Sequence, residues 1–136
     1  MVFVRACAVW LLIMATETAH GVLRALFLVP WIGDFPARQF SVFTGSLLIF
    51  LIALLTIRWI GARSIGQLVG MGALWIALTI GFEIGVGRFV AGFPWSRILE
   101  DFDVSRGGML GLGLLFMGAT PLLAAKLRGW PPSDRS

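Results

Sequence analysis

Three residues that can carry charge or exchange protons stand inside the first apolar stretch, residues 4–29. Glu17, His20 and Arg24 are spaced i, i+3 and i+7, so a helix places them on one face. A carboxylate and an imidazole can bind and release protons near neutral pH, and a guanidinium pairs with carboxylates and phosphates in a planar, bidentate manner. A charged side chain at the centre of a bilayer costs about 2.5 to 3.5 kcal/mol, so we expect this face to turn inward.

A second polar pair, Glu83 and Arg88, stands in the apolar stretch 67–91. Positions that differ by five are separated by about 140° around an α-helix, so the two side chains do not share a face. Pairing within this stretch is therefore disfavoured. We predict pairing between helices instead, with Glu83 directed at Arg24 or His20.

The segment 95–106 carries further charges that could serve as partners. Its apolar residues fall on one side, which suits a helix lying in the membrane interface: Ile98, Leu99 and Phe102. If this helix folds against the bundle, Asp101 and Asp103 become candidate partners for Arg24 or Arg88.

Two interpretations of these charges stay open. In the first, they form a satisfied network that fixes the register between helices. In the second, they line a proton- or ion-linked cavity open to the outer side, with Glu17 and Glu83 as titratable carboxylates. Arg24 and Arg88 would then favour an anionic ligand or a lipid headgroup.

A metal site is a third interpretation. Glu17-x-x-His20 has the spacing used in di-iron carboxylate bundles, but one chain supplies only this pair and Glu83, so a full ligand set requires a homodimer. The single histidine excludes a bis-histidine haem within one chain. No G-x-S-x-G, Walker or H-E-x-x-H motif occurs, so the sequence favours a protein that is not an enzyme and predicts no cofactor.

The elements that position these residues follow from composition. The 136 residues are 58% hydrophobic and 13% charged, whereas about 25% charged residues is usual for soluble domains. A helix needs about 20 apolar residues to cross a bilayer, and four stretches approach or exceed this: 4–29, 40–59, 67–91 and 107–126. The sequence therefore predicts an all-α integral membrane protein, a four-transmembrane-helix bundle surrounded by lipid bilayer. Basic residues are scattered singly, which disfavours nucleic acid as a partner.

Basic residues and tryptophans predict the orientation of the bundle. Six basic residues fall at the N-terminus, the middle loop and the C-terminal end: Arg5, Arg58, Arg63, Lys126, Arg128 and Arg135. The opposite loops mix three arginines with four acids: Arg38, Arg97, Arg106, Asp34, Glu100, Asp101 and Asp103. The positive-inside rule then places both termini in the cytoplasm, and the expected location is a bacterial inner membrane. Tryptophans mark the outer and inner ends of the spans: Trp31 and Trp95, and Trp59 and Trp130.

A pattern shared by the two halves predicts a parallel duplication of a two-helix unit. Three residues recur 64 positions later, Arg24, Pro30 and Trp31 as Arg88, Pro94 and Trp95. After a short insertion three more recur, Asp34, Phe35 and Arg38 as Asp101, Phe102 and Arg106. The units 1–65 and 66–128 each hold two spans, so they share one orientation and an axis along the membrane normal, and 129–136 is a short polar tail. The alternative is that both loops converged on similar interface residues.

Small residues at spacings of three or four follow the third span: Gly66, Gly70, Ala73, Ala77, Gly81 and Gly85. Because transmembrane helices associate by close backbone approach over small residues, this stripe predicts a packing face. Part of such a face can also serve an oligomer interface.

The length of the chain and the isolated carboxylate in its first span invite comparison with small four-helix exporters and fluoride channels, but the motifs of neither group are present. Two functions stay open. The first is transport or sensing of a small ion or anion at a polar site near the outer side, by a homo-oligomer. The second is an accessory or assembly subunit of a larger membrane complex. A pocket lined by Glu17, His20 and Glu83 favours the first, whereas fully paired charges and an outward-facing small-residue stripe favour the second.

Overall fold

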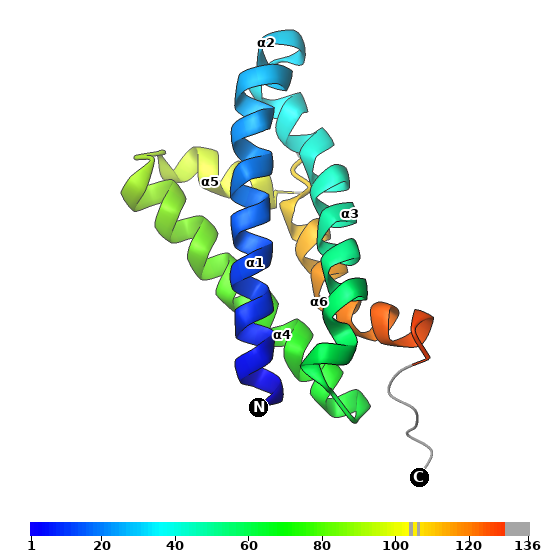
Figure 1. Cartoon of the computed structure of the whole chain (residues 1–136). Coiled ribbons are helices and arrows are strands. Elements are labelled where there is room, and N and C mark those ends of the chain that lie inside the picture. Colours follow the sequence, from blue (N-terminus) through cyan, green and yellow to red (C-terminus); the bar gives the residue numbers. More distant parts are fainter. Residues whose placement is uncertain (104, 106, 130–136) are drawn as a thin grey trace.

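The protein is a bundle of helices. The computed structural model describes residues 1–103, 105 and 107–129, and within these residues there is no strand. The elements are α1 (Val2–Leu23), η1 (Arg24–Leu28), α2 (Val29–Ile32), α3 (Asp34–Ile60), α4 (Ile65–Gly85), η2 (Val86–Val90), α5 (Trp95–Phe102) and α6 (Leu110–Leu127). Because η1 and η2 continue their neighbouring helices, the described residues hold four helices long and apolar enough to cross a membrane: Val2–Ile32, Asp34–Ile60, Ile65–Val90 and Leu110–Leu127. The predicted all-α class and the four long apolar helices are confirmed (Figure 1).

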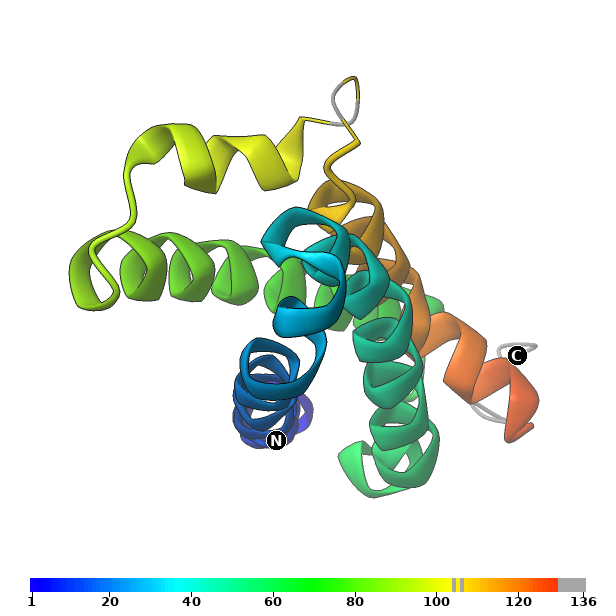
Figure 2. The same cartoon turned by 90° about the horizontal axis from the view of Figure 1, so that it is seen from above.

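Helix α6 lies at the centre of the bundle. It packs along both α3 and α4, and α1 packs mainly on α3. The N-terminus, the α3–α4 connection and the end of α6 lie at one end of the bundle, whereas α2 lies at the other (Figure 1). Seen from above, the far end of α4 diverges from α1 and α3, and α5 runs back from it towards the start of α6 (Figure 2). The bundle is therefore close-packed at one end and splayed at the other.

Helix α3 begins at Asp34, earlier than the predicted start at residue 40. Pro36 lies in the first turn of α3, where a backbone N–H has no helical partner and proline is tolerated. Asp34 also lies in this first turn, where a negative charge is favourable. The connection is reduced to Gly33, whose φ of 91° is a conformation that favours glycine.

Each of the two long helices that diverge contains a π-helical turn near its outer end. In η1 the N–H of Val29 donates to the carbonyl of Arg24, and in η2 the N–H of Ala91 donates to that of Val86 at 2.8 Å. Pro30 follows η1 and lacks the N–H that an α-helix would require, which accounts for the widened turn before it. Helix α1 therefore continues through Pro30 to Ile32.

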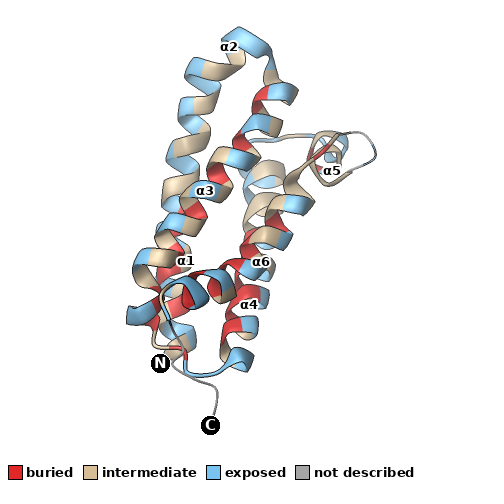
Figure 3. Ribbon diagram, turned by 90° about the vertical axis from the view of Figure 1, so that its right-hand side faces the viewer, coloured by how far each residue is buried: buried red, intermediate tan, exposed pale blue. Residues whose placement is uncertain are grey.

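Tryptophans fix the close-packed end. Trp75 is fully buried and donates through Nε1 to the carbonyl of Ala6 at 3.0 Å, which joins α4 to α1. Trp10 joins the same helices by donating to Thr79 Oγ1 at 3.0 Å. Buried residues concentrate in this half of the bundle (Figure 3). A buried indole N–H that is hydrogen-bonded adds a directional contact to the apolar packing.

The small-residue stripe of α4 does not face the bundle. The buried residues of α4 form a different face: Leu68, Met71, Gly72, Trp75 and Thr79. Most of the stripe is exposed, at Gly66, Ala73, Ala77 and Gly81. The prediction that this stripe is the packing face inside the bundle is therefore wrong. The close approach of α4 to α6 occurs instead at Gly72 and Gly118, where a Cβ on Gly72 would overlap the carbonyl oxygen of Gly118.

Arginines at the close-packed end donate hydrogen bonds to backbone carbonyls of α3 and α6. Arg5 donates to the carbonyl of Trp59 at 2.7 Å and lies over its ring at 5.1 Å. Arg58 and Arg128 join α3 and the end of α6 through the carbonyls of Arg128 and Leu54, at 2.9 and 3.1 Å. The contacts with the carbonyls of Trp59 and Arg128 satisfy the C-terminal ends of α3 and α6 and suit the helix dipole. The predictions for Arg106, Trp130 and the tail fall outside the described residues, apart from Gly129.

Candidate functional site

A cavity of about 430 Å³ lies in the splayed half of the bundle. Its walls come from α1 and η1, α3, α4 and η2, α5 and α6. Seven charged or titratable residues line it: Glu17, His20, Arg24, Arg38, Glu83, Arg97 and Asp101. Its lining also includes the exposed residues Thr18, Val22 and Val86, so the cavity is open between the end of α1 and η2. The structure thus brings Glu17, His20, Arg24 and Glu83 to one cavity.

Glu17 is held against α3. A Cβ at position 45 would lie 2.7 Å from Glu17 Oε2, so a larger residue there would push this carboxylate out of its place. His20 Nδ1 lies 3.9 Å from the same Oε2, and His20 Nε2 is 2.6 Å from Thr44 Oγ1. Glu17 Oε1 is buried and has no hydrogen-bond partner within the described part of the chain. The α1 face predicted from spacing therefore turns towards α3 and the cavity.

Glu83 and Arg24 line the cavity from different elements, α4 and η1. Among the described residues, neither side chain makes a hydrogen bond or an ion pair, so the predicted direct pairing of Glu83 with Arg24 or His20 is not formed. Arg24 is nevertheless close enough to interact electrostatically with Glu17 and Glu83. The cavity therefore holds two carboxylates and one guanidinium that form no ion pair with one another among the described residues.

Arg88 lies outside this cavity. Its Nη1 donates to the carbonyl of Phe93 at 3.3 Å, and its guanidinium lies 5.4 Å from the centre of the Trp95 ring. Arg24 and Arg88 recur at matched sequence positions but have different surroundings. The structure thus separates Arg88 from the other four residues that the sequence grouped with it.

Arg38 is the centre of an ion-pair network that the sequence did not single out. Its Nη1 contacts Asp101 Oδ1 at 2.5 Å, its Nη2 contacts Glu100 Oε1 at 2.9 Å, and its Nε contacts Asp34 Oδ2 at 3.1 Å. The Arg38 side chain is only 10% exposed. Asp101, predicted as a partner for Arg24 or Arg88, therefore pairs with Arg38. Asp103 accepts hydrogen bonds from the N–H and the hydroxyl of Ser105 instead, at 3.1 and 2.5 Å.

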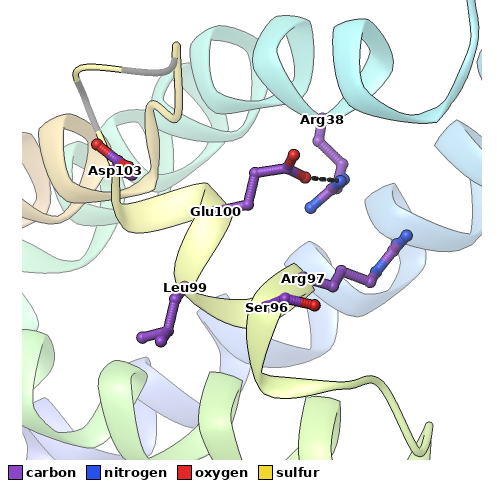
Figure 4. Close-up of a pocket in the computed structure, with 6 residues that line it drawn as sticks. All are labelled: Arg38, Ser96, Arg97, Leu99, Glu100 and Asp103. Atoms are coloured by element: carbon purple, nitrogen blue, oxygen red, sulfur yellow. Dashed lines mark hydrogen bonds and ion pairs between the residues drawn. The ribbon is translucent and has the colours of Figure 1, made fainter.

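Arg97 extends this network from α5 to the start of α3. Its Nη1 lies 2.6 Å from Asp34 Oδ2, and its guanidinium is 4.0 Å from the centre of the Phe93 ring. On the outer side of α5 lies a surface hollow of about 520 Å³, shown with its lining in Figure 4. Charges spaced by one helical turn, Asp34 with Arg38 and Arg97 with Asp101, are the sequence signal that could have indicated the network.

No three His, Cys, Asp or Glu side chains converge as a metal site requires, within the part of the chain that the structure describes. The arrangement offers proton exchange at Glu17, His20 and Glu83, and anion binding at Arg24. Ionisable groups at membrane depth that face a cavity mark ion, proton or substrate pathways in membrane proteins. No protein-family model, curated protein or solved structure matches this chain, so its function has to be argued from this site.

Proposed function

We propose that the protein is an integral membrane protein that transports or senses a small anion, linked to protons, through the cavity at the splayed end of its bundle. The carrying observation is that Glu83 and Arg24 line one cavity without a hydrogen bond or ion pair among the described residues, together with Glu17, whose buried Oε1 has no hydrogen-bond partner there. A register-fixing network would pair its charges, as Arg38 does. Unpaired charges at membrane depth are expensive and are retained where they bind or move something.

Insertion in the bilayer with both termini in the cytoplasm is part of this proposal. It is supported by four long apolar helices and by the gathering of Arg5, Arg58 and Arg128 at the end that holds the N-terminus. The mixed charges of α5 and the start of α3 belong to the opposite side, which suits the positive-inside rule. We propose a bacterial inner membrane on the same grounds.

Cysteines introduced at Ser64 and Ser96, each in a Cys7→Ser background, are expected to react from opposite sides of the membrane. Both serines are exposed and lie in the α3–α4 connection and in α5. Labelling with a membrane-impermeant maleimide, before and after permeabilisation of cells, measures this. Reaction of both cysteines from the same side would contradict the four-span arrangement.

Glu17→Gln and Glu83→Gln are expected to reduce proton-linked anion flux at least about tenfold, because general acid–base groups of this kind carry the proton and glutamine cannot. The measurement uses purified protein in liposomes that contain a pH-sensitive dye, with an imposed anion gradient. Empty liposomes give the background.

Glu100→Gln is the matched control, because it makes the same chemical change outside the cavity. Glu100 lines the surface hollow, and Arg38 keeps two other carboxylates when Glu100 is neutralised. Flux close to that of the wild type is expected. Background flux in every folded sample, the wild type included, would overturn the transport proposal.

We also propose that the bundle arose by duplication of a two-helix unit. The matched residues of the two halves support this, as does a π-helical turn that contains Arg24 in one half and Arg88 in the other. The packing of α1 on α3 has its counterpart in that of α4 on α6, and α3 and α6 meet at the centre. Related halves with one orientation fit an axis along the membrane normal.

An accessory or assembly subunit of a larger membrane complex is the second candidate. It is favoured by the exposed stripe of α4, with Ala73, Ala77 and Gly81, since small residues facing outward allow another transmembrane helix to approach closely. The same stripe can serve a homo-oligomer. A folded protein without flux in the liposome experiment would favour this candidate.

A further inference from the structure

Two of the three arginines that line the cavity, Arg38 and Arg97, are already paired with carboxylates. Arg38 contacts Asp101, Glu100 and Asp34, and Arg97 contacts Asp34. Arg24 is thus the arginine of the cavity lining left without an ion pair among the described residues. A guanidinium in this position is an anion-binding group, because it offers several N–H donors in one plane.

The remainder of the lining is mainly apolar. Buried residues form the inner part of the cavity: Met14, Ile49, Leu114 and Met117. Met14 and Arg24 are ten residues apart on one helix, about 15 Å at the α-helical rise. The cavity therefore has an apolar floor and a cationic group towards its outer end. A hydrated inorganic ion gains nothing from such a floor, whereas an apolar body gains about 25 cal/mol per Å² that it buries.

The volume limits the size of the ligand. About 430 Å³ is near the lower end of the range for small-molecule sites, roughly 300 to 1,000 Å³. A phospholipid with two acyl chains does not fit inside this space. The volume thus fits a molecule with one anionic group and a short apolar body.

The neighbouring carboxylates make anion binding depend on protons. With Glu17 and Glu83 ionised, the group formed with Arg24 carries a net charge of −1, and with both protonated it carries +1. Like charges in one weakly solvated site repel one another, so an anion on Arg24 is favoured when both carboxyls are neutral. The charged and titratable groups that face this site come from α1, η1, α3, α4 and α5, and α6 contributes none: Glu17, His20, Arg24, Arg38, Glu83, Arg97 and Asp101.

We propose that the ligand is a small organic monoanion with an apolar body, bound by Arg24 together with protons on Glu17 and Glu83. This assignment rests on the proposed function and names its substrate class. Arg24 holds the anionic group, the apolar body lies over Met14 and Met117, and each bound anion brings protons with it. Proton and anion affinities then rise together, as linkage requires.

Benzenesulfonate is a suitable probe, because it stays a monoanion at any relevant pH and carries an apolar ring. Its binding to the purified protein in detergent is measured by equilibrium dialysis at slightly acidic and slightly alkaline pH. We expect binding roughly tenfold tighter at acidic pH. Chloride and benzenedisulfonate are expected to compete poorly, because one lacks the apolar body and the other carries a second charge.

Variants separate the contributions of Arg24 and of the two carboxyl groups to benzenesulfonate binding. Arg24→Gln is expected to lose benzenesulfonate binding, whereas Arg88→Gln, the matched change outside the cavity, keeps it. The double variant Glu17→Gln/Glu83→Gln mimics the protonated pair, so it binds at both pH values with about equal affinity, even though it transports nothing. This last result does not depend on whether the Arg24 variant folds.

Three results would overturn the assignment: wild type that does not bind benzenesulfonate, Arg24→Gln that binds as wild type does, or wild-type affinity that is equal at both pH values. Proton-linked flux of other anions without benzenesulfonate binding would refute the proposed ligand class but not the proposed transport function. Binding of benzenesulfonate without any flux would refute transport but not the proposed ligand class.

Discussion

Arg38→Met is expected to detach α5 from α3 and to lower the free energy of unfolding by roughly 2 to 4 kcal/mol. Removal of one partner from a buried ion pair costs about 3 to 5 kcal/mol, since the remaining charge is left uncompensated. Here the three carboxylates are 27% to 42% exposed, which lowers this figure. Their mutual repulsion acts in the opposite direction. Because methionine keeps most of the apolar stem of the arginine, the loss in free energy of unfolding measures the contribution of the guanidinium.

Two measurements check this expectation. Unfolding in a denaturing-detergent titration gives the free energy, with Arg63→Met as control, because Arg63 is exposed in the α3–α4 connection. Labelling of Ile98→Cys in a Cys7→Ser background reports α5 itself, because Ile98 is the buried residue of this helix. Labelling should accelerate at least about tenfold when Arg38 is replaced. Equal labelling rates with and without Arg38 would show that apolar packing alone holds α5.

The four long helices were predictable because the apolar stretches exceed what a soluble domain tolerates, and such a signal does not depend on packing. The start of α3 was harder to predict from the sequence. Pro36 and Asp34 indicate a turn when considered singly, yet both suit the first turn of a helix. Whether these residues form a turn or begin a helix depends on where the chain reverses. It reverses at Gly33 because α1 packs against α3, and this contact is part of the tertiary structure.

The face of α4 could not be inferred from small residues alone. Spacing places residues on one side of a helix but does not say whether that side meets another helix of the same chain. The face that packs on α6 contains one glycine, Gly72, among large residues such as Met71 and Trp75. A single glycine gives no periodic signal.

The α1 part of the site was predictable, and the remainder depends on tertiary structure. Glu17, His20 and Arg24 share a face by spacing, and the cavity receives all three. Arg88 does not join the other predicted site residues at the cavity. The reasons are that α4 diverges from α1 (Figure 1) and that the π-turn η2 alters the rotation along the helix. Two of the three partners of Arg38, Glu100 and Asp101, are more than 60 positions away in the sequence, so only the fold brings them to it.

Gly72→Ala is expected to destabilise the bundle by about 3 kcal/mol, at the upper end of what overpacking costs. The added Cβ would overlap the carbonyl oxygen and carbonyl carbon of Gly118, which are backbone atoms of α6. Because backbone atoms cannot turn aside as a side chain does, α6 itself has to move away from α4. That movement would also disturb the contacts of α6 with α3, since α6 lies at the centre of the bundle.

Two further glycines turn this expectation into a graded series. A Cβ at Gly118 would meet the end of the flexible Ile76 side chain at 2.5 Å, so Gly118→Ala should cost only about 1 kcal/mol as Ile76 adjusts. A Cβ at Gly81 meets nothing within 4 Å, and alanine favours a helix, so Gly81→Ala should be neutral or stabilise by up to about 1 kcal/mol. The measured order of unfolding free energies should therefore be Gly81→Ala highest, Gly118→Ala next and Gly72→Ala lowest. Equal values for Gly72→Ala and Gly81→Ala would contradict the close crossing of α4 and α6, and with it the divergence of α4 that opens the cavity.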